Sequence, residues 1–111
     1  MQIQINTDSN IEGREELATE FRTVVEDALS RFSDHITRVE VYLSDENSDK
    51  GGSADKRCVM EARLKGPPPI AVTDQAATVG QAVDGAASKL KKAIESSLGR
   101  LRDHQRPRTD A

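Results

Sequence analysis

The chain has 111 residues, a length that suits one compact domain with its own hydrophobic core. Its residues are 35% hydrophobic and 32% charged, the formal net charge is −3, and no apolar run is long enough to span a membrane. A single cysteine, Cys58, excludes an internal disulfide and a cysteine-cluster metal site, and the polar N-terminus is unlike a secretory signal peptide. These features predict a cytoplasmic protein.

The charges are unevenly distributed along the chain. Residues 1–75 carry nine Lys or Arg against 15 Asp or Glu, whereas residues 76–111 carry seven against four. The net charges are therefore −6 and +3. Blocks of opposite sign indicate a face for an anionic partner, although charges that serve only solubility would give the same totals.

The first half of the chain predicts a strand, a helix and two further strands. Residues 2–6 alternate polar and apolar, which places Ile3 and Ile5 on one side of a strand. Apolar residues then recur at helical spacing, which predicts a helix over 14–32. Residues 36–44 and 56–65 alternate again, and the segment between them, 45–55, lacks apolar periodicity and is expected to be a loop.

The second half predicts one more strand and a long helix. The GPPP sequence forces a turn, since proline cannot donate to a sheet, and a short strand follows over about 70–73. An apolar stripe then runs from Val79 to Leu101 at helical spacing. Pro107 prevents this helix from continuing much past Gln105.

The predicted element order is β-α-β-β-β-α. A crossover helix makes the first two strands parallel, and hairpins make the others antiparallel. Each helix has one apolar stripe, so both should cover the same sheet face. We therefore expect an α+β two-layer sandwich with a four-stranded mixed sheet, similar to the double-stranded-RNA-binding domain. Residues 1–105 would form a single domain and 106–111 a short tail.

The sequence suggests no catalytic residues. His35 falls between the first helix and the second strand, and His104 lies near the end of the last helix, so both are expected on the surface. Cys58 alternates with core positions in a strand, which is typical of an inert buried thiol. We therefore expect the protein not to be an enzyme.

Metal and cofactor sites are not expected either. Asp45, Asn47 and Asp49 have the spacing of a calcium loop, but Lys50 stands where glycine is needed and Lys56 where glutamate is needed. The adjacent glycines at 51–52 are not followed by a helix, so they do not form a phosphate-binding motif.

The last helix is the basic element of an acidic chain. At 3.6 residues per turn, Lys89, Lys92 and Arg100 share one outward side. Lys91 and Arg102 share another, next to the apolar stripe. Surface cations of an ordinary amphipathic helix would show the same pattern, so it does not by itself identify a partner. Three aromatic residues in the whole chain argue against binding by base stacking.

Three stretches of the chain resemble a known family. They are INTDSNIEGREEL, the pair RVEVYLSDEN and CVMEARLKG, and AVTDQAATVGQAVDGAASKLKKAI. They resemble the ribosome hibernation promoting factor and ribosome-associated inhibitor family, also called sigma-54 modulation proteins. In this order they are similar to the family's first strand and helix start, its central hairpin, and its last strand and helix. The likeness covers residues 1–105 and implies the same β-α-β-β-β-α fold.

The resemblance also implies a function. Members of the family are not enzymes; they bind the small ribosomal subunit through its 16S-type rRNA, block the mRNA and tRNA channel, and cause ribosome hibernation under stress or in stationary phase. By length the chain resembles the short form. DNA, membranes, cofactors and small-molecule ligands are not expected, while an exposed edge strand leaves self-association open. The rRNA contacts carried over from the family are Lys89, Lys91, Lys92, Arg100 and Arg102.

The sequence departs from the family in three places. Ser96, Ser97 and Leu98 stand where close members are basic, the first helix is rich in acids, and the loop over 45–55 is longer and more acidic than usual. The alternative function is therefore a divergent paralogue that acts as a protein–protein regulatory module without ribosome binding.

Overall fold

The computed structural model describes residues 1–8, 11, 14–45 and 56–105, with the backbone alone described for residues 14 and 100–105. All predicted helices and strands are present. They are β1 (Gln2–Thr7), α1 (Arg14–Leu29), the 3-10 helix η1 (Ser30–His35), β2 (Ile36–Asp45), β3 (Lys56–Leu64), β4 (Ile70–Ala76) and α2 (Val79–Gln105).

The strands form one mixed sheet in the order β1-β2-β3-β4. β1 is parallel to β2, with Ile5 opposite Val41, and the other two pairs are antiparallel, as predicted. The order follows the chain because every connection except the α1 crossover is a hairpin.

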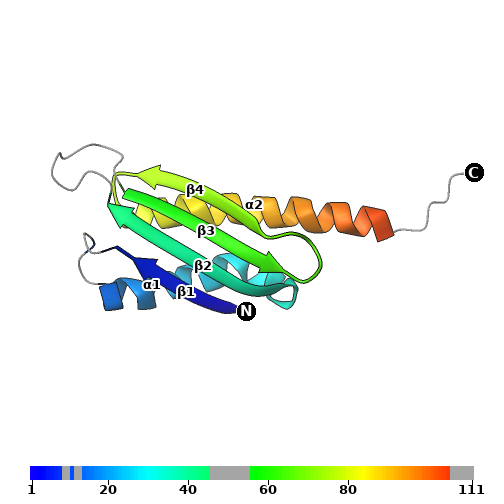
Figure 1. Cartoon of the computed structure of the whole chain (residues 1–111), viewed down its shortest axis with the longest axis horizontal. Helices are drawn as coiled ribbons and strands as arrows, with labels where there is room; N and C mark the ends of the chain where they lie inside the picture. Colours follow the sequence, from blue (N-terminus) through cyan, green and yellow to red (C-terminus); the bar gives the residue numbers. More distant parts are fainter. Residues whose placement is uncertain (9–10, 12–13, 46–55, 106–111) are drawn as a thin grey trace, which may run out of the picture.

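Both helices lie on one face of the sheet, behind it in the view of Figure 1, so the predicted α+β two-layer sandwich is confirmed. The core lies between the layers. Its largest fully buried side chains are Val25, Leu29, Ile36, Val39, Val41, Met60, Val83, Leu90 and Ile94. Burying each such side chain contributes about 1.5–3 kcal/mol, which is the main stabilisation of the fold. None of the helices in the described ranges combines the length and apolarity that crossing a membrane requires.

The boundaries of two predicted elements were wrong. The first helix ends as an α-helix at Leu29 rather than at Phe32, and η1 continues to His35. A 3-10 helix has three residues per turn, so Phe32 stays on the side of Leu29 and remains buried. The last strand extends to Ala76 rather than Thr73.

Gly66 shapes the turn between β3 and β4. Its φ is +100°, a backbone region that side chains other than that of glycine rarely adopt. The three prolines that follow lead the chain into the edge strand β4.

Candidate nucleic-acid interface on the second helix

Helix α2 has a buried apolar side and an exposed polar side. Its buried side consists of Ala82, Val83, Ala86, Ala87, Leu90 and Ile94. Its exposed side consists of Gln81, Asp84, Ser88, Lys89, Lys92, Glu95 and Ser96. The exposed side thus holds two of the predicted RNA contacts, Lys89 and Lys92.

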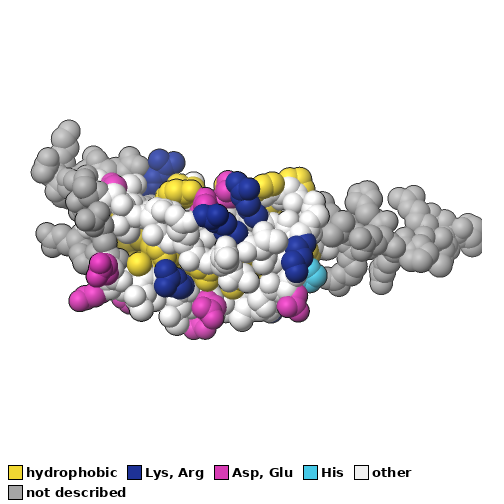
Figure 2. Space-filling model, turned by 60° about the horizontal axis from the view of Figure 1, so that its bottom comes forward, with side chains coloured by type: hydrophobic (Ala, Val, Ile, Leu, Met, Phe, Trp, Pro, Cys, Tyr) yellow, Lys and Arg dark blue, Asp and Glu magenta, His cyan; other side chains and the backbone are white. Residues whose placement is uncertain are grey.

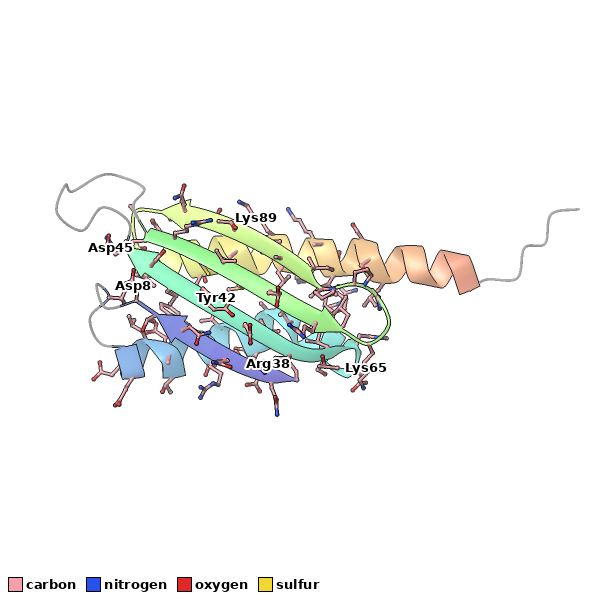
Figure 3. All side chains as sticks on the ribbon, viewed as in Figure 1. Asp8, Arg38, Tyr42, Asp45, Lys65 and Lys89 are labelled. Carbon is pink, nitrogen blue, oxygen red and sulfur yellow. The ribbon has the colours of Figure 1, made fainter. Side chains whose placement is uncertain are left out.

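Lys89 lies at the border between α2 and the sheet edge. Its Nζ donates a hydrogen bond of 2.9 Å to the carbonyl oxygen of Thr73 and lies 2.9 Å from Oδ1 of Asp74. Figure 3 shows it beside β4. The side chain is still 55% exposed, but its charge is partly compensated by the carboxylate. Lys89 therefore stabilises the α2–β4 contact, which the sequence did not reveal.

Gly85 leaves the space that the Asp74 carboxylate of this ion pair occupies. A Cβ at residue 85 would lie 2.1 Å from Oδ2 of Asp74, far inside van der Waals contact. Asp74 occupies an inward position of β4, and its side chain is only 22% exposed. Because residues 85 and 89 are one turn apart, the glycine gives the carboxylate room and the lysine supplies its counter-charge.

Lys92 lies in the middle of the exposed side. It has no ion pair with any other described residue, and its neighbours one turn away, Ser88 and Ser96, are exposed hydroxyls. The nearby Glu95 is engaged by Arg31 at 3.2 Å, and this guanidinium also lies over the Phe32 ring, 4.9 Å from its centroid. We call the row Ser88–Lys92–Ser96 the α2 strip; its one cation, Lys92, forms no ion pair with a described carboxylate.

The remaining predicted contacts are only partly placed. Lys91 is half-buried at the flank of α2. Arg100 and Arg102 belong to α2, but their side chains lie outside the described part of the structure. The structure thus brings Lys89, Lys91 and Lys92 together on one helix, and none of the five rRNA contacts is tested by it.

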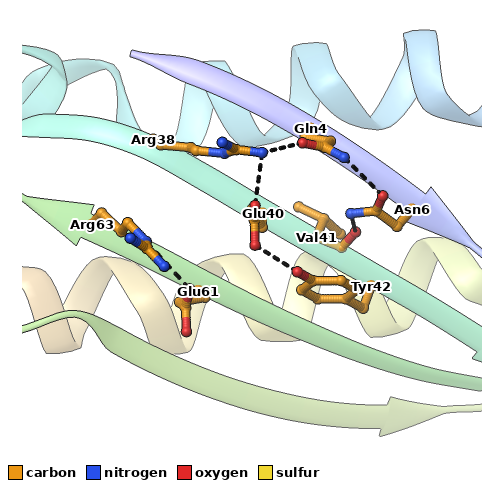
Figure 4. A network of polar contacts seen from close by, with 8 residues as sticks. All are labelled: Gln4, Asn6, Arg38, Glu40, Val41, Tyr42, Glu61 and Arg63. Carbon is orange, nitrogen blue, oxygen red and sulfur yellow. Dashed lines mark hydrogen bonds and ion pairs between the residues drawn. The ribbon is translucent and has the colours of Figure 1, made fainter.

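The open face of the sheet carries a network of compensated charges (Figure 4). Arg38 forms an ion pair of 2.8 Å with Glu40 and a hydrogen bond to Gln4. The hydroxyl of Tyr42 donates a 2.5 Å hydrogen bond to the same Glu40 carboxylate, which raises the pKa of Tyr42 above its usual value. With its cations paired to acids, this face is a weaker candidate for phosphate binding than α2.

Helix α1 presents the opposite electrostatic character. Its exposed acids have no ion-pair partner among the described residues, and the one exposed cation described on this helix is Arg22. Figure 2, seen from the side of β1 and α1, shows acidic side chains along this rim. The acids are Glu15, Glu16, Glu20, Glu26 and Asp27.

The described groups considered for catalysis and metal binding do not form a site. Cys58 is fully buried, and burial raises the pKa of its thiol to about 12. His35 is exposed at the end of η1. Within the described ranges no three His, Cys, Asp or Glu side chains come together, and Asn47 and Asp49 of the calcium-like spacing lie outside those ranges.

Comparison with known proteins decides the family. Residues 9–102 match the family described as sigma 54 modulation protein / S30EA ribosomal protein. The chain belongs to this family. No curated protein matches the chain in sequence.

Two solved structures have a fold similar to that of this chain. The N-terminal domain of Thermus thermophilus Protein Y is 21% identical with a TM-score of 0.62, over 86% of this chain and 98% of that one. A ribosomal subunit interface protein from Coxiella burnetii is 17% identical with a TM-score of 0.58, over 86% of this chain and 96% of that one.

Proposed function

We propose that the protein is a ribosome-associated translation inhibitor, a hibernation factor of stress or stationary phase. It binds the small ribosomal subunit through rRNA and blocks the mRNA and tRNA channel. The observation that carries this proposal is the family match over residues 9–102, which spans α1, the strands β2, β3 and β4, and most of α2. The name of the Coxiella burnetii structure, a ribosomal subunit interface protein, agrees with it.

The exposed side of α2 supplies a physical mechanism. Folded rRNA presents closely spaced phosphates, and lysines that contact them release condensed counterions. Lys92 offers an uncompensated charge, and the hydroxyls of Ser88 and Ser96 add hydrogen-bond donors to the same row. A rigid two-layer domain bound in the channel would exclude mRNA and tRNA sterically, without base-specific contacts.

Cosedimentation with ribosomes on sucrose gradients tests the proposal. The protein should travel with the small subunit at low salt. If three phosphates are contacted, its affinity should fall about 20- to 40-fold between about 50 and 200 mM salt. Absence from the ribosomal fractions at low salt would refute ribosome binding, and salt-independent binding would refute the phosphate mechanism.

Two charge reversals localise the contact. Lys92→Glu should weaken ribosome binding by about tenfold, because one phosphate contact is lost and a repulsion is added. Arg22→Glu is the matched control, since it makes the same change in net charge on an exposed position of α1. Equal effects of the two variants would show that net charge, and not the α2 strip, governs binding.

The acids of α1, which have no ion pair with a described residue, favour a second candidate, a protein–protein regulatory module without ribosome binding. Affinity capture distinguishes the two. Recovery of a defined protein without rRNA would support the second candidate, and recovery of small-subunit rRNA would support the first.

A further inference from the structure

The outer edge of β1 carries unpaired backbone groups. β1 has β2 as its sole neighbour in the sheet, and the N–H of Asp8 donates a 3.0 Å hydrogen bond to the carbonyl of Leu43. Along a strand, the backbone groups of every second residue face the same neighbour. Because the N–H of Asp8 faces β2, the backbone groups of Gln4 and Asn6 also face β2. The residues whose N–H and C=O groups face away from the sheet are then Ile3, Ile5 and Thr7.

The two edges of the sheet differ in protection. At β4, the ammonium group of Lys89 occupies the carbonyl of Thr73 and places a charge at the edge, a common way to prevent strand addition. At β1, no described residue bonds to the outward groups, and the strand from Gln2 to Thr7 has no charged side chain. The β1 edge is therefore the less protected of the two.

The side chains of β1 define what such a strand would look like. Ile3 and Ile5 are half-buried on the helix side, whereas Gln2, Gln4 and Asn6 lie on the open face. An added strand would alternate in the same way, with one set of its side chains on the helix side, over α1, and the other set on the open face.

The rim of α1 next to this edge defines the charge of the partner. Arg31 of η1, directly after α1, forms an ion pair with Glu95, so α2 lies on that side of the α1–η1 segment. Glu15 and Glu26, eleven residues apart, share one line of the helix, roughly opposite that side. They flank Arg22 and have no ion pair with a described residue. These two acids outnumber Arg22, so this line of α1 keeps a net negative charge, which complements a cationic segment.

We propose that the outer edge of β1 receives an extended, lysine- or arginine-bearing segment of another protein as a fifth strand. Backbone hydrogen bonds to the outward groups supply the affinity, and the lysines or arginines on the helix side of the added strand meet the α1 carboxylates, which select the charge. A second copy of this chain fits less well, because pairing two β1 edges would bring two acidic α1 helices side by side. The proposal does not depend on ribosome binding, and its test contains neither RNA nor ribosomes.

Amide hydrogen exchange on the isotope-labelled protein tests the proposal within one strand. In the free protein the Gln4 and Asn6 amides should be protected, while those of Ile3, Ile5 and Thr7 should exchange rapidly. The probe is an N-acetylated heptapeptide of alternating lysine and valine, and its control replaces each lysine by glutamate. The lysine peptide should slow exchange at the three outward amides by at least about tenfold.

Charge variants of α1 provide the matched control. Glu15→Lys/Glu26→Lys should weaken binding of the lysine peptide by about tenfold. Glu16→Lys/Asp27→Lys has the same change in net charge on another side of the helix and should have little effect.

Three results would overturn the proposal. The first is unchanged exchange of the outward amides with the lysine peptide. The second is equal binding of the lysine and glutamate peptides, or equal effects of the two charge variants. The third is a concentration-dependent dimer in sedimentation velocity that protects the same amides without any peptide.

Discussion

Gly85→Ala tests whether the Asp74–Lys89 ion pair depends on the absence of a side chain at residue 85. In a helix interior this substitution normally stabilises by about 1 kcal/mol. Here the new Cβ would lie 2.1 Å from Oδ2 and 2.6 Å from Cγ of Asp74, so the carboxylate has to move. Moving it separates a mostly buried acid from the ammonium that lies 2.9 Å away.

The loss of that pair should outweigh the gain in helix propensity. Leaving a partly buried charged group without its partner costs about 2–3 kcal/mol. Subtracting the gain in propensity, Gly85→Ala should lower the free energy of unfolding by roughly 1–2 kcal/mol. In an Asp74→Ala background the clash is absent, and the same substitution should raise stability by about 1 kcal/mol.

Urea denaturation followed by far-UV circular dichroism measures both values. Gly99→Ala is the matched control, because it lies in the same helix and its Cβ would meet nothing within 4 Å. It should stabilise by about 1 kcal/mol whether or not Asp74 is present. If Gly85→Ala has the same sign in both backgrounds, the proposed steric role of Gly85 is wrong.

Three further predictions follow from the core and the open sheet face. The Cys58 thiol, whose pKa is raised from 9.0 to about 12, should react with maleimide only as fast as the protein unfolds. The free energy of unfolding should fall as the pH rises from 9.0 towards 12, because the thiol of the unfolded chain ionises first. Ultraviolet titration should show Tyr42 ionising at higher pH than a free tyrosine, and Glu40→Gln should lower that pKa; an unchanged titration would exclude the hydrogen bond as its cause. Leu90→Ala should lower the free energy of unfolding by about 2–5 kcal/mol because Leu90 is fully buried, and a loss below about 1 kcal/mol would contradict the packing.

The sequence predicted the elements and their faces because these depend on local periodicity. Alternation in β2 and β3 placed Val41 and Met60 in the core, and the stripe of α2 placed Leu90 there. The end of β4 was misplaced because Asp74 is a charged residue at an inward position, and alternation alone gives no reason for burying it.

The surroundings of Lys89 could not be predicted because they depend on two distant segments. A helical projection places Lys89 outward, but it does not show that the edge of β4 lies beside it. The spacing of Gly85 and Lys89 by one turn was a usable signal, since a small residue and a cation on one helix line can accommodate a carboxylate. By contrast, Lys92 was placed correctly on the exposed side, because nothing packs over that side of α2 in the described structure.

The parallel pairing of β1 with β2 has a consequence for the order of folding. The β2–β3–β4 meander and α2 are contiguous in the chain and joined by hairpins, so they can assemble first, whereas β1 has to wait until α1 has crossed the sheet. β1 is also held along one side only, which makes it the natural unit of partial opening in the native state. The β2–β3–β4 strands and α2 would then stay assembled while the first strand detaches and returns.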